Sequence, residues 1–125
     1  MNQMHLSANA SGTDANATKY MANPLEESVK LFKVLLTPNI SVSTHASNYM
    51  TFDIKKGSTV LATFTTNSSG GAALTAGTPV ELTITGSGKD VEVASDGAFT
   101  LLCTKAGTGP AYDVTATLAV QGIRQ

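Results

Sequence analysis

The stretch Pro79–Val120, PVELTITGSGKDVEVASDGAFTLLCTKAGTGPAYDVTATLAV, contains four short strand-like segments separated by glycine-rich turns. Within each segment apolar residues alternate with Thr, Glu or small polar residues, as in Phe99, Leu101 and Cys103. A period of two places alternate side chains on opposite faces of a sheet, one packed and one in contact with water. The stretch therefore predicts strands that are buried on one face.

The same pattern continues upstream. Tyr49–Lys55 and Thr59–Thr66 flank a Lys56-Gly57 turn, which predicts a hairpin. We expect its core face to consist of the apolar residues Met50, Phe52, Ile54, Val60, Ala62 and Phe64. Further strands are expected at Val29–Leu36, Ile40–Val42 and Val91–Val93. About eight short strands with these turn signals predict an all-β fold, an antiparallel β-sandwich of jelly-roll or immunoglobulin-like form.

Composition limits the partners and the compartment. The 125 residues suit a single domain, only 14% of them are charged, and the net charge is −1. No basic stripe for nucleic acid is present, so we expect no nucleic-acid partner. No apolar run reaches membrane-spanning length and the start has no basic leader, so we expect no membrane association and no export by the general route. One cysteine allows no internal disulfide.

The N-terminal residues differ from the rest in composition. Residues 1–28 are rich in Asn, Ala, Ser and Thr, and we interpret them as an extended arm that either docks on a partner or is a frayed terminus. Asn23-Pro24-Leu25-Glu26 has the cap and proline of a short helical turn. Residues 29–125 then form the sandwich domain. The arm residues predicted to contact a partner or a neighbouring subunit are Met4, Leu6, Tyr20 and Met21.

No set of residues has the spacing of a catalytic or metal site. His5 and His45 lie far apart, whereas zinc needs three or four convergent ligands, so surface histidines are expected. Asp90 and Asp96 are either calcium ligands or, more commonly, residues that bond their own turns. Cys103 alternates with apolar residues and is interpreted as a buried small hydrophobe. We expect no enzymatic activity and no cofactor.

Turns and strand edges recur in a distinctive order. The segments are Asn48–Thr51, Lys56-Gly57, Leu74–Gly77, Val91–Gly97, Phe99–Leu101, Thr104–Pro110 and Val114–Val120. Together, over about residues 30–122, they resemble the small β-sandwich head-decoration (cement) proteins of tailed bacteriophages. The resemblance implies a structural virion protein on the outside of a capsid, commonly a homotrimer, whose partner is the major capsid protein. It also implies assembly in the host cytoplasm.

A different class of function is left open by the same residues. A fibre, tail or adhesin-type recognition module that binds a glycan or a receptor is the alternative hypothesis. Sugar-binding modules usually present aromatic platforms, and this chain has no tryptophan and three tyrosines. An arm that donates a strand to another subunit is a variant of the alternative.

Overall fold

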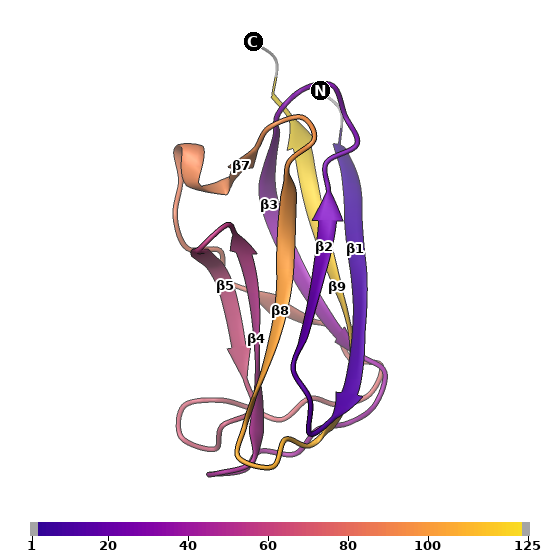
Figure 1. Cartoon of the computed structure of the whole chain (residues 1–125), viewed down its shortest axis with the longest axis vertical. Helices are drawn as coiled ribbons and strands as arrows, with labels where there is room; N and C mark the ends of the chain where they lie inside the picture. The colour runs from indigo at the N-terminus through magenta and orange to yellow at the C-terminus, as the bar shows by residue number, and fades with distance from the viewer. Residues whose placement is uncertain (1–2, 124–125) are drawn as a thin grey trace.

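Alternating apolar residues build two antiparallel sheets that pack face to face (Figure 1), in a computed structural model that describes residues 3–123. Sheet A has the strand order β1-β9-β3-β6, with β7 also paired to β3, and sheet B has the order β2-β8-β4-β5. The elements are β1 (Gln3–Thr13), β2 (Ala17–Ala22), β3 (Val29–Pro38), β4 (Tyr49–Lys56), β5 (Thr59–Thr65), β6 (Val80–Leu82), the 3₁₀ helix η1 (Gly88–Val91), β7 (Glu92–Val93), β8 (Ala98–Ala106) and β9 (Ala111–Gly122). The predicted β-sandwich is confirmed.

The stretch Pro79–Val120 supplies an interior strand to each sheet. In sheet B, β8 lies between β2 and β4, and in sheet A, β9 lies between β1 and β3. Their alternate side chains are fully buried between the sheets, as predicted: Phe99, Leu101, Cys103, Val114, Ala116, Leu118 and Val120. Phe52 of β4 meets Tyr112 of β9 edge to face, with ring centroids 5.8 Å apart. The two sheets therefore share one core.

The predicted N-terminal arm is wrong for the described residues. All 11 residues of β1 pair with β9, from Gln3 opposite Gln121 to Thr13 opposite Ala111. Strand β2 pairs with β8 over its whole length. Residues 3–13 alternate polar residues at odd positions with apolar or small residues at even positions, which is the period of a strand. The pattern is weak because two of the inward residues are alanines, whose burial contributes little free energy. The sandwich domain thus begins before residue 29.

The short helical turn predicted after Asn23 does not form. Asn23 is buried, and its Oδ1 accepts a hydrogen bond from the Leu25 N–H at 3.0 Å, as an N-cap would. Its Nδ2, however, donates to the carbonyls of Glu27, Val93 and Ala94. These bonds tie the segment to β7 and leave it an irregular connection.

Three smaller expectations also need correction. Ile40–Val42 forms only one bridge, between Val42 and Leu74. A register shift after Ile54 inserts an extra residue in β5, so Leu61 is buried and Val60 is 43% exposed. The hairpin itself is confirmed, with Gly57 at φ 58 in its turn. Val91 belongs to η1, so β7 is shorter than the predicted strand.

Candidate binding surface

The outer face of sheet B is rich in threonine. We call it face B. It consists of the side chains that point away from the core: Thr18 and Tyr20 of β2, Thr100, Leu102 and Thr104 of β8, Tyr49, Thr51, Asp53 and Lys55 of β4, and Thr63 and Thr65 of β5. Six of these 11 residues are threonine, and Asp53 and Lys55 cancel in charge. Face B is therefore neutral, and short, branched threonine side chains make up more than half of it.

Strand register sets the rows of face B. Thr18, Leu102, Asp53 and Thr63 lie side by side across the four strands. The next row pairs Thr51 with Thr65, and the Thr51 hydroxyl donates to the Thr65 hydroxyl at 3.2 Å. Branched side chains have few rotamers on a sheet, so ordering this face on binding costs little conformational entropy.

Tyr20 is the most exposed large apolar side chain of the described residues, at 74%. It lies opposite Thr100 at the β2 edge of face B. A tyrosine offers contact area and a hydroxyl, with two side-chain torsions to restrain. Tyr20 therefore offers an accessible ring and hydroxyl at this edge of face B.

The outer face of sheet A differs in charge and in hydrogen bonding. We call it face A. Its Asp113 accepts hydrogen bonds from Asn9 Nδ2 at 2.8 Å and Asn39 Nδ2 at 3.0 Å. The Asn39 bond, and then the Asn9 bond, lower the pKa of Asp113. Face A also carries four charged residues: Lys30, Lys33, Glu81 and Glu92.

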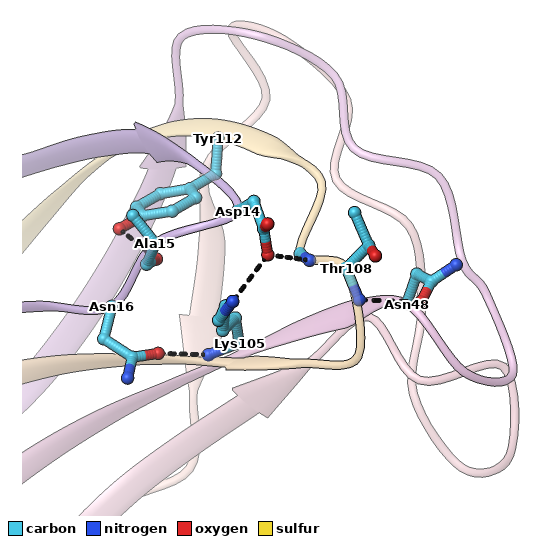
Figure 2. A network of polar contacts seen from close by, with 8 residues as sticks. Asp14, Ala15, Asn16, Asn48, Lys105, Thr108 and Tyr112 are labelled. Atoms are coloured by element: carbon cyan, nitrogen blue, oxygen red, sulfur yellow. Dashed lines mark hydrogen bonds and ion pairs between the residues drawn. The ribbon is translucent and has the colours of Figure 1, made fainter.

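A polar network holds the loops together at one end of the sandwich (Figure 2). Asp14 Oδ1 accepts from Lys105 Nζ at 2.7 Å and from the Gly109 N–H at 2.9 Å. These two interactions, the lysine first, lower the pKa of Asp14. The Tyr112 hydroxyl donates to the Ala15 carbonyl at 3.0 Å.

The same network leaves little space for a ligand. Asn16 Oδ1 accepts from the Lys105 N–H at 2.7 Å, and Asn48 Oδ1 accepts from the Thr108 N–H at 2.9 Å (Figure 2). A Cβ at Gly109 would lie 2.7 Å from Lys105 Cβ, so the loop packs closely on that lysine. The bonds of Asp14, Asn16, Asn48 and Tyr112 all join one segment to another, which makes this end a structural clasp.

A groove of about 420 Å³ lies between the edge strands β5 and β6. It is lined mainly by apolar and threonine side chains: Val60, Ala62, Thr63, Phe64, Val80, Glu81, Leu82, Thr83 and Thr85. The Thr85 N–H donates to the Leu61 carbonyl at 2.7 Å. The groove holds one carboxylate and no second titratable group, which leaves it without an acid–base pair.

The predicted contact residues are divided between the core and the surface. Leu6 and Met21 are 7% and 3% exposed and belong to the core, so their assignment as surface contacts is wrong. Met4 is half-buried on the inner side of β1. Tyr20 alone of the four is freely exposed. Strand pairing, which turns each second residue inward, explains the division.

The histidines and aspartates that were weighed as metal ligands lie on the surface. His5 and His45 are both exposed, and His45 Nδ1 accepts from the N–H groups of Ser47 and Asn48. Asp90 and Asp96 are also exposed. Between residues 3 and 123, no three His, Cys, Asp or Glu side chains come together as a metal site.

Cys103 is fully buried between the sheets, as the sequence predicts. Burial, and then the negative charge of Asp53, raise its pKa to about 12. A protonated, inaccessible thiol is a poor nucleophile.

Comparison with known proteins found no related protein. No family model matches the chain, and neither the curated proteins nor the solved structures contain a match. The structure, over residues 3–123, has no helix of the length and apolar character needed to cross a membrane. The geometry of the sandwich therefore carries the functional argument.

Face B could not be predicted as a unit from the sequence. Its threonines come from four separate strands, and register between strands is needed to bring them together. A usable signal was present within two of the strands. In Thr63-Phe64-Thr65 the threonines flank a half-buried residue, and in Thr100-Leu101-Leu102-Cys103-Thr104 the outward Thr100, Leu102 and Thr104 alternate with two buried residues.

Proposed function

We propose that this protein is a structural component of a virion that binds the outside of a phage capsid and stabilises it as a decoration, or cement, protein. The observation that carries the proposal is face B, a neutral threonine surface with the exposed Tyr20 on a rigid two-sheet core. The resemblance of residues 30–122 to phage decoration proteins supports it. Its partner is the major capsid protein, its place is the capsid surface, and it is assembled in the host cytoplasm.

The chemistry of face B suits contact with another protein. Tyrosine is enriched among the residues that dominate interface energies and threonine is not, so Tyr20 is expected to supply most of the binding energy while the threonines supply a neutral surround; charged residues are depleted at interface centres. Because Asp53 and Lys55 offset each other, binding through this face depends weakly on ionic strength. Face A, with Asp113 and four other charged residues, meets those criteria less well.

A decoration protein strengthens a shell by bridging its subunits. Each copy makes a modest contact, and copies joined in an oligomer convert later contacts into intramolecular ones of high effective concentration. The resemblance implies three copies. We include a homo-oligomer in the proposal for this reason.

The experiment is co-sedimentation with empty shells assembled from the cognate major capsid protein. Tyr20→Ala removes the anchor, and Thr104→Lys adds a charge in the middle of face B; both are expected to reduce binding at least tenfold. Thr117→Lys is the matched control, because Thr117 lies on the outer face of the interior strand β9 of sheet A. Wild-type protein that stays in the supernatant would refute shell binding, and equal losses from Thr104→Lys and Thr117→Lys would refute the role of face B.

A recognition module of a fibre, tail or adhesin is the second candidate. Two observations favour it: Tyr20 can stack on a sugar ring, and the β5–β6 groove has a volume in the range of small-ligand sites. Glycan-array binding that is lost in Tyr20→Ala, together with no affinity for shells, would replace the first proposal by this one.

A further inference from the structure

Four edges limit the two sheets, and three of them are protected. An edge strand exposes unpaired N–H and C=O groups that can pair with another chain. At one side of sheet A, β6 and β7 have only 3 and 2 residues. In sheet B, β5 carries a register shift, and Thr85 covers the carbonyls of Val60 and Leu61. Short length, a bulge and side-chain cover are devices that prevent edge pairing.

The β2 edge is protected by a charge. Lys19 lies opposite Leu101, whose side chain is fully buried, so Lys19 is on the core-facing side of β2. An added strand would have to pack beside this ammonium group. A lysine that points inward at an edge disfavours such addition.

The β1 edge has none of these devices. Its 11 residues contain no Pro, Lys, Arg, Asp or Glu, and His5 is their one ionisable side chain. Its pairing with β9 is unbroken from Gln3 to Thr13, and no strand within residues 3–123 pairs with its other side (Figure 1). Every second residue therefore directs its N–H and C=O away from β9, along an edge of about 36 Å.

We propose that β1 pairs antiparallel with β1 of a second copy of this chain, so that two A sheets become one continuous sheet. A register with Ala8 on the twofold axis uses the whole strand and keeps the inner and outer faces in phase. On the inner face it sets Leu6 opposite Ala10 and Met4 opposite Gly12. On the outer face it sets His5 opposite Ser11 and Ser7 opposite Asn9.

The strand is complementary to itself in size and in charge. Each large inner side chain meets a small one, and the half-buried Met4 and Ala8 gain cover from the partner. No charged pair is brought together. An antiparallel pair of this length forms about ten to twelve backbone hydrogen bonds, the number found in a typical protein interface. These features favour a second copy over an unrelated peptide, because a peptide would need small side chains opposite Met4 and Leu6 and large ones opposite Ala10 and Gly12.

The pairing does not depend on capsid binding. It gives a particle of two chains rather than the three implied by the resemblance, so the mass of the particle in solution separates the two. Sedimentation equilibrium of the full chain is expected to give twice the 12.8 kDa chain mass. A monomer or a trimer at about 100 μM would overturn the pairing.

Two double variants test the register. His5→Lys with Ser11→Lys sets like charges opposite each other twice across the axis, and is expected to raise the dimer dissociation constant about tenfold. His5→Glu with Ser11→Lys changes the same exposed positions and keeps the lysine substitution opposite Asp113, but sets opposite charges across the axis, and is expected to retain the dimer. Equal dissociation constants for the two variants would overturn the proposed register.

A cross-link gives a second, independent readout. Ala8→Cys places two thiols at the axis, where facing Cα atoms of an antiparallel pair lie within disulfide range, and oxidation is expected to yield a covalent dimer. Ser11→Cys is the control, because its two copies would lie about 20 Å apart along the strands. Cross-linking of Ser11→Cys as fast as Ala8→Cys would contradict the pairing.

Discussion

Faces A and B are made by strands of the same chain, yet they fix their polar groups in different ways. Face A holds Asp113 between Asn9 and Asn39, so this carboxylate is already hydrogen-bonded within the protein. Face B places hydroxyls in rows and leaves Tyr20 free. The difference shows that exposure and availability are separate properties, because a polar group already satisfied within the protein has less to gain from a partner.

Both faces require residues 3–22, because β1 is a strand of sheet A and β2 is a strand of sheet B. Deleting residues 1–22 would remove β1 from sheet A and β2 from sheet B and expose β8 and β9. We expect the truncated chain to lose its cooperative thermal transition, measured by circular dichroism. A truncated chain that still melts cooperatively would show that these strands are dispensable.

A large core substitution should weaken both faces together. Phe52→Ala removes a fully buried ring that packs on Tyr112 between the sheets, and is expected to lower the free energy of unfolding by about 3–5 kcal/mol. Tyr112→Phe keeps the ring and loses the hydroxyl bond to Ala15, which should cost about 1 kcal/mol. Urea titration measures both, and equal losses would contradict the assigned packing.

Acid should destabilise the protein through Asp113 of face A and Asp14 of the loop clasp. The pKa values of Asp113 and Asp14 are lowered in the folded protein, so the unfolded chain binds protons at these groups more readily. Their stabilising contribution is complete above the unfolded pKa near 3.8 and is lost as the pH falls through the lower folded values. Asp113→Asn should therefore reduce the slope of stability against pH below about 4. An unchanged slope would show that Asp113 is not held by its two asparagines.

The smallest expected effect concerns Cys103, which lies between the two sheets. Cys103 is fully buried and its pKa is about 12, so a thiol reagent at pH 8 should label the native protein far more slowly than the urea-unfolded chain. The labelling rate, followed by mass spectrometry, measures opening of the core. Equal rates in the native and unfolded states would contradict the burial of Cys103.

The sequence predicted the sandwich because most strands carry a strong period of two. Met50, Phe52 and Ile54 mark β4 without ambiguity, and Gly57 marks the turn that follows. Residues 3–13 have the same period, but three of the inward positions are Ala or Gly (Ala8, Ala10 and Gly12), and such small side chains make the contrast faint. The pairing partner β9 lies about a hundred residues away, so β1 is stabilised by a contact that no local pattern reveals.

The surface was harder to predict than the core. Tyr20 was named among the contact residues, but its neighbours on face B were not, because Thr100 and Thr63 are brought together only by the order of strands in sheet B. The β5 bulge also shifted Val60 from the core to the surface. A single inserted residue reverses the face of those beyond it, and composition carries no record of its position.

The central claim is that face B, and not face A, meets the capsid. Two exposed aromatic residues report on the two sheets: Tyr20 of β2 on face B, and Phe32 of β3 in sheet A, 45% exposed. Hydroxyl-radical footprinting of the full chain, free and bound to shells, measures the oxidation rate of each. The account predicts that shell binding slows oxidation of Tyr20 several-fold and leaves Phe32 unchanged. Protection of Phe32 with no change at Tyr20 would contradict it.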